Sequence, residues 1–170
     1  DVQKALIDEI EPVNEEGLRR ISSLVTPHNA LAVVPIPEAG TDFKLVLNNL
    51  CVAIDCIQDP GNLGTIIRSA AWFGISDIMC SPDSVDRFNS KVIQAAMGAH
   101  MHVNVHYCGL DDFLKEAVKM NVPVYGALMK GKSVYTMELG PKGVVLLGNE
   151  SKGISVHLRS YVSEKISIPK

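Results

Sequence analysis

Apolar and polar positions alternate regularly from residue 45 onward. Short apolar runs bounded by turn residues are typical of buried strands, whereas apolar positions three or four apart indicate helices. These patterns predict strands over residues 50–57, 75–81, 101–107, 122–129, 143–150 and 165–169. They predict helices over residues 62–74, 89–99, 109–121 and 157–163. Strands that alternate with helices predict an α/β fold: a parallel sheet with helices on both faces.

The N-terminal part of the chain follows a different pattern. It favours one or two short helices, the last of them over residues 14–25, where Asn14 is placed to act as the N-cap. Residues 31–36 form an apolar run that predicts a short strand, and a proline-rich linker follows. We therefore expect a separate N-terminal segment over residues 1–36 and the main domain over residues 37–170.

Composition indicates the broad class of protein to which this chain belongs. The chain has 170 residues, of which 46% are hydrophobic and 21% charged, as in one ordinary globular domain. No apolar run reaches the roughly 20 residues that a membrane span needs, and no signal segment opens the chain, so we expect a cytoplasmic protein. The net charge of −3 argues against a surface that is basic throughout. The four cysteines match no zinc or redox spacing and are expected to be reduced, mostly buried thiols.

The first candidate site is the segment 58–68, QDPGNLGTIIR, which follows a predicted strand. We expect a turn at its Pro-Gly pair, Asn62 as the helix cap, and Gly64 as a point where another backbone comes close. Arg68 lies within two helical turns of Asn62, and a helix N-terminus with an arginine suits a phosphate or a polarised hydroxyl. The alternative is an ordinary capped helix with a surface Arg–Asp pair. Neither a Walker lysine nor a GxGxxG motif is present.

The second candidate site is the segment 144–154, VVLLGNESKGI, in which an apolar strand runs into glycines. Gly148 directly after the strand would let a flat ligand lie against bare backbone. Glu150 at the end of a buried strand is either an acid–base group or a partner for Arg68. The alternative is a tight turn with a solvated glutamate.

Together, the two segments resemble the SpoU family of RNA 2′-O-ribose methyltransferases, also called the TrmH family. Residues 89–105 are also similar to the family's middle segment, and residues 22–34 are similar to the stretch that leads into its catalytic domain. The resemblance covers roughly residues 20–170. The residues that match the two main motifs are Asn62, Gly64, Arg68 and Gly74 in the first, and Leu147, Gly148, Asn149, Glu150 and Gly153 in the second.

The resemblance implies a trefoil-knotted α/β domain that uses S-adenosylmethionine as methyl donor, acts on rRNA or tRNA, and forms a homodimer. Arg68 would hold a phosphate of the target nucleotide or help activate its 2′-hydroxyl, and Asn62 and Glu150 would shape that site. The residues implied in donor binding are Leu128, Gly148, Asn149, Gly153 and Ile168. No metal is implied. Residues 1–36 would be the tail of an N-terminal RNA-binding domain with its linker, and residues 37–170 the methyltransferase domain.

One departure from the family pattern keeps other functions open. The third family motif begins here at Ile168 and stops at Lys170, so we expect an incomplete C-terminus. A catalytically inactive RNA-binding module of the same lineage is one alternative. A nucleotide hydrolase with residues 149–153 as a phosphate loop is another. Further features left open are three histidines at positions 100, 102 and 106, as a metal site or a sheet or dimer surface, and Trp72 with Phe73, as core or dimer packing.

Overall fold

The computed structural model describes residues 9–22, 24–36 and 40–169. The chain divides into two compact units, Asp1–Glu38 and Ala39–Lys170. In the first unit, α1 (Glu15–Ile21) forms as predicted, because the Asn14 side chain accepts a hydrogen bond from the Gly17 amide at 2.8 Å.

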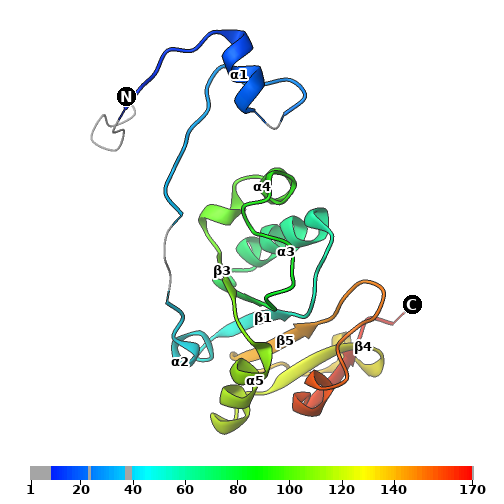
Figure 1. Ribbon diagram of the computed structural model, residues 1–170. Coiled ribbons are helices and arrows are strands. Elements are labelled where there is room, and N and C mark those ends of the chain that lie inside the picture. The colour runs from blue at the N-terminus through cyan, green and yellow to red at the C-terminus, as the bar shows by residue number, and fades with distance from the viewer. Residues whose placement is uncertain (1–8, 23, 37–39, 170) are drawn as a thin grey trace. The chain divides into compact units, whose positions relative to one another are not determined.

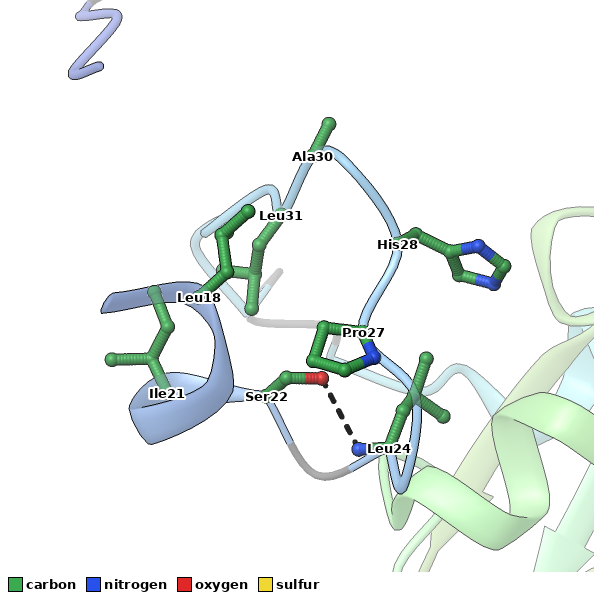
Figure 2. A pocket seen from close by; sticks show the side chains of 8 residues that line it. All are labelled: Leu18, Ile21, Ser22, Leu24, Pro27, His28, Ala30 and Leu31. Atoms are coloured by element: carbon green, nitrogen blue, oxygen red, sulfur yellow. Dashed lines mark hydrogen bonds between the residues drawn. The ribbon is translucent and has the colours of Figure 1, made fainter. Parts of the chain in front are cut away.

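Residues 24–36 of the first unit expose several large apolar side chains. The strand predicted over residues 31–36 is wrong: the segment has no strand partner among the described residues, and Val33 is 91% exposed. A hollow of about 230 Å³ lies between α1 and the following loop, with Leu18, Ile21 and Leu31 on its wall (Figure 2). No described residue of α1 is buried.

The second unit is built on a six-stranded parallel sheet, as the sequence predicted (Figure 1). Its strands are β1 (Leu50–Ile54), β2 (Asp77–Cys80), β3 (Asn104–Tyr107), β4 (Val124–Ser133), β5 (Gly143–Leu147) and β6 (Glu164–Ser167), in the spatial order β3-β2-β1-β5-β4-β6. Every pairing between neighbouring strands is parallel.

The helices of this unit connect the strands. They are α2 (Phe43–Val46), α3 (Pro60–Trp72), α4 (Ser90–Ala96) and α5 (Leu110–Lys119), with short 3₁₀ turns η2 (Ala99–Met101), η3 (Val134–Thr136) and η4 (Leu158–Tyr161). Two predicted elements differ from the structure. In the segment 101–107, Met101 ends the 3₁₀ turn η2 and the strand begins only at Asn104. Residues 157–163 contain the 3₁₀ turn η4 where we expected a helix. None of the helices in the described ranges is long and apolar enough to cross a membrane.

The hydrophobic core has two halves, one on each face of the sheet. Val52 and Ile54 of β1 pack in the half that contains Leu63 of α3, while Cys51 and Ala53 pack in the half that contains Phe113 of α5. Because successive side chains of a strand point to opposite faces, β1 is buried on both sides. Burial also raises the pKa of the Cys51 and Cys80 thiols to about 12, so both are neutral core groups.

The strand order fixes where a ligand can reach the sheet. β1 lies between β2 and β5. From β1 the chain builds β2 and β3 on one side of this strand, and then crosses over to build β4, β5 and β6 on the other side. In open parallel sheets such a switch point leaves a crevice outside the carboxyl ends of the two strands. Here these ends are Ile54 and Leu147, which lie opposite each other in the β1–β5 register.

Candidate active site

The loops that follow β1 and β5 are joined at the switch point. The Asn149 side-chain amide donates to the carbonyl oxygen of Cys56 at 2.8 Å. The Asp55 amide donates to the carbonyl oxygen of Leu147 at 2.9 Å, which extends the strand pairing by one bond. The two sequence motifs therefore meet at the edge of the sheet where the strand order predicts a site.

Asn62 lies inside the helix, and Asp59 takes the capping position that we predicted for Asn62. The Asp59 side chain accepts a hydrogen bond from the Asn62 backbone amide at 2.8 Å, and Pro60 occupies the first turn, where its fixed φ and missing N–H cost nothing. The expected turn at Pro60–Gly61 is accordingly the start of α3. This correction leaves the Asn62 side chain free from capping.

The freed Asn62 side chain contacts Glu150. Its Nδ2 donates to Glu150 Oε1 at 3.1 Å, while Asn149 Nδ2 lies 3.3 Å from Glu150 Oε2. The Asn62 hydrogen bond, together with backbone N–H groups around the carboxylate, holds the pKa of Glu150 below its ordinary value. Glu150 is therefore ionised at neutral pH, and it serves better as a fixed acceptor that orients Asn62 than as a general base.

Arg68 projects from α3 into solvent, about two turns beyond Asn62. Its guanidinium Nη1 lies 3.0 Å from the Met97 sulfur, a weak acceptor. Within the described ranges no carboxylate lies within ion-pair distance of Arg68, so neither the Arg–Asp pair nor the Arg68–Glu150 pair forms. The positive charge on Arg68 is available to an anion from outside the chain.

Gly64 is explained by helix packing. A Cβ at this position would lie 2.5 Å from Ala95 Cβ and 2.7 Å from the Val92 carbonyl oxygen, both on α4. The expected close approach of another backbone is therefore confirmed, and the approaching backbone is that of α4. This contact sets the close spacing of α3 and α4, across which Arg68 reaches Met97 at the end of α4.

The loop after β5 folds back on itself. Gly153, at φ +67°, and Asn149 exchange backbone hydrogen bonds of 2.8 and 3.1 Å, and a Cβ on Gly148 would lie 2.1 Å from the Ile154 nitrogen. Only glycine fits at Gly148. The Asn149 Oδ1 accepts the amides of Ser151 and Lys152, both at 3.0 Å. These two N–H groups are thus occupied, which argues against residues 149–153 as a phosphate loop.

The other two candidate donor residues belong to neighbouring strands: Leu128 lies within β4, and Ile168 comes after β6. Leu128 and Gly148 each lie two positions beyond the paired residues Gly126 and Leu146 of β4 and β5. Leu128 is half-buried against the core and starts a bulge of four residues, because Ile166 pairs with both Ala127 and Lys132. Ile168 follows β6 directly and is 74% exposed. Backbone and apolar groups thus gather along one edge of the sheet.

Sequence reasoning missed Asp55, which is 5% exposed. Its carboxylate accepts a hydrogen bond from the Ser155 amide at 2.6 Å and so fixes the end of the loop after β5 to the end of β1. The signal that would have found it is a carboxylate directly after a buried strand, a residue type that is seldom buried without a partner.

The three histidines do not converge. His100 belongs to η2 and His102 follows it, whereas His106 lies on β3 and contacts Asp77 and Thr41. The described residues contain no group of three His, Cys, Asp or Glu side chains with metal-binding geometry.

Comparison with known proteins relates the chain to one family. Residues 49–170 match the SpoU rRNA Methylase family. The chain is 30% identical over 158 residues to the 23S rRNA (guanosine(2553)-2′-O)-methyltransferase RlmP of Bacillus subtilis, covering 92% of this chain and 62% of that protein. It therefore spans less than two thirds of the length of this relative.

Solved structures share the fold. A TrmH-family protein from Porphyromonas gingivalis superposes with a TM-score of 0.76 at 33% identity, over 90% of this chain and 61% of that one. The AdoMet-bound rRNA methyltransferase from Sinorhizobium meliloti superposes with a TM-score of 0.65 at 34% identity, over 72% of this chain and 48% of that one. The motifs, the sheet and these relatives together show that the chain belongs to the SpoU rRNA methylase family.

Proposed function

We propose that this protein transfers a methyl group from S-adenosylmethionine to a ribose 2′-hydroxyl of rRNA or tRNA in the cytoplasm. The observation that carries the proposal is the contact between Asn62 and Glu150 at the switch point, with the Arg68 guanidinium facing solvent on the same helix. An oriented amide and an available positive charge on α3 support a substrate site on this helix. A ribose with its adjoining phosphate presents a hydroxyl and an anion, the two groups that such a pair binds.

We assign the donor to the edge of the sheet formed by the middle of β4 and the ends of β5 and β6. Bound there, S-adenosylmethionine supplies an electrophilic methyl group with a good leaving group. Gly148, Asn149 and Gly153 would offer backbone groups to its polar parts, and Leu128 and Ile168 would cover its apolar parts. The folded-back loop supports this assignment, since its own hydrogen bonds and the Asp55 carboxylate hold its shape.

Arg68, Asn62 and Glu150 would bind and position the ribose that accepts the methyl group. A ribose hydroxyl is a poor nucleophile, so it must be positioned in line and polarised as it attacks. Arg68 would bind the phosphate, and its positive charge would stabilise the negative charge that develops on the hydroxyl oxygen. Asn62, held by the ionised Glu150, would fix the ribose. A lowered pKa on Glu150 favours this positioning role over proton removal.

The partner assignments extend the same proposal. We place a homodimer contact over α3, because Trp72 and Phe73 are 85% and 78% exposed and so are not core residues. We assign residues 1–36 to the tail of an N-terminal RNA-binding domain and its linker, supported by the exposed apolar side chains of that unit. We assign residues 37–170 to the methyltransferase domain, with the trefoil knot that the resemblance to the family implies.

The test is methyl transfer from labelled S-adenosylmethionine to unmodified total RNA, with the full-length protein beside its Arg68→Ala variant. The proposal expects label in RNA, resistance to alkaline cleavage at one ribose, and loss of label in the variant. The matched control is Lys91→Ala, which removes an exposed positive charge from α4. Absence of both label and donor binding would overturn the proposal and favour an RNA-binding module of the same lineage.

A further inference from the structure

A second constellation of reactive side chains lies away from the proposed methyl-transfer site. Thr41 precedes α2, Asp77 is the first residue of β2, and His106 lies on β3. Thr41 Oγ1 is 2.7 Å from His106 Nδ1, and His106 Nε2 is 2.9 Å from Asp77 Oδ1. The His106 side chain is only 10% exposed and that of Asp77 17%. Nothing in the proposed methyl transfer uses these three groups.

The proton positions in this chain of hydrogen bonds follow from Asp77. Burial alone would raise the pKa of Asp77, but hydrogen bonds from His106, Ser76 and Asn104 hold it below its ordinary value. Asp77 is therefore a carboxylate and can only accept, so His106 Nε2 must carry the proton between them. In the neutral imidazole, Nδ1 is then bare and accepts the hydroxyl proton of Thr41.

This is the arrangement of an activated nucleophile: a hydroxyl, a base within hydrogen-bond reach, and a carboxylate that orients the base. The two ring nitrogens have exchanged roles relative to the serine protease triad, in which the hydroxyl faces Nε2. The exchange leaves the chemistry intact, because either nitrogen of imidazole can take the proton.

Thr41 lies at a cleft of about 410 Å³. Asp77 and His106 also line this cleft, together with Asn48 and Asn49. Asparagine amides are donors that stabilise negative charge on a carbonyl oxygen. The cleft thus combines a nucleophile, its base and two amides, the set of groups that acyl transfer requires.

We propose that Thr41 is an activated hydroxyl that accepts an acyl group from an activated ester or thioester bound in this cleft. The Thr41 oxygen forms a bond to the carbonyl carbon, and its proton passes to His106 Nδ1. The bond from that carbon to the leaving oxygen or sulfur then breaks, and the leaving group departs as an anion or takes the proton from His106. The product is an ester on Thr41.

The test uses the full chain and p-nitrophenyl acetate, with peptide mass spectrometry to locate acetyl groups. We expect acetyl on Thr41 and much less on Thr136, the control, whose hydroxyl donates to the Ser133 carbonyl oxygen and contacts no imidazole. His106→Gln should slow acetylation of Thr41 by about 100-fold, the lower range for loss of a general base. Thr41→Ser should keep the label.

Three results would overturn the proposal. The first is acetylation of Thr41 at the same rate as Thr136. The second is an unchanged rate in His106→Gln. The third is a Thr41→Ser chain that is folded, by circular dichroism, but unlabelled. In each case the hydrogen bonds would serve only to fix the segment before α2 to the sheet. Because the readout is independent of methyl transfer, failure of one proposal leaves the other standing.

Discussion

The Asn62 amide donates to the Glu150 carboxylate at 3.1 Å, across 88 residues of sequence. This contact joins the first turn of α3 to the loop after β5, two segments that the switch point brings together. It also determines the ionisation of Glu150 and the orientation of the Asn62 amide. Glu150 stays ionised, and the Asn62 amide keeps one orientation, with its carbonyl oxygen left to accept a hydrogen bond from a ligand.

The first prediction concerns the pH dependence of stability. The folded-state pKa of Glu150 lies below its ordinary value of 4.5, so ionised Glu150 stabilises the fold above that value, and this contribution is lost as pH falls through the lowered pKa. Glu150→Gln should therefore lower Tm by about 1–3 °C at pH 7, a small effect because the group is exposed. Thermal denaturation from pH 3 to 7 should show the two curves converging at the acid end. A difference in Tm that stays the same from pH 7 to pH 3 would show that ionisation of Glu150 is not its cause.

The second prediction separates the roles of Arg68. Arg68→Lys keeps the charge but loses the planar fork that binds a phosphate through two hydrogen bonds. Methyl transfer should fall by about 10- to 100-fold, while the Kd for S-adenosylmethionine and Tm stay unchanged. Calorimetric donor binding beside single-turnover methyl transfer checks both. If the Kd rises along with the loss of rate, Arg68 acts on the donor, and its assignment to the RNA phosphate fails.

The third prediction concerns the glycine after β5. Gly148→Ala would place a Cβ 2.1 Å from the Gly153 and Ile154 backbone, so the loop must open. We expect a loss of about 1–3 kcal/mol in unfolding free energy and loss of donor binding. The control is Gly140→Ala, whose Cβ would meet nothing nearer than 3.8 Å. Urea denaturation and donor titration of both variants measure the difference. Equal behaviour of the two would show that the loop is not rigid.

The centre of the sheet was predictable because β1, β2 and β5 are apolar runs in which most residues are buried. Side-chain burial alternates along β1 between two core halves, so the apolar pattern alone located that strand. The N-cap of α3 was not predictable in the same way. Asp59 and Asn62 are both good caps, and Pro60 between them decides the choice because it fits only the first helical turn.

The candidate site was predictable only in part, since its bonds join residues distant in sequence. Glycine after a strand marked Gly148, but the reason for it, the backbone of Gly153 and Ile154, appears only in the folded loop. Asp55 carried no local signal beyond its place after β1, and its partner Ser155 is 100 residues away. The strand predicted over residues 31–36 failed for a related reason. An apolar run becomes a strand only when a neighbouring strand pairs with it, and no described residue pairs with this segment.

The last prediction concerns the exposed aromatic pair at the end of α3. Trp72 and Phe73 lie one turn beyond Arg68, and Met97, which contacts Arg68, is 74% exposed. An apolar patch of this kind beside a site is expected to be covered by a second copy of the chain. In sedimentation velocity the native protein should run at twice its chain mass, and Trp72→Asp should run as a monomer because burying the new charge is costly. Val118→Asp, a charge placed on the 53% exposed Val118 of α5, is the control and should leave the dimer intact. A native monomer, or a Trp72→Asp dimer as tight as the native one, would remove α3 from the proposed interface.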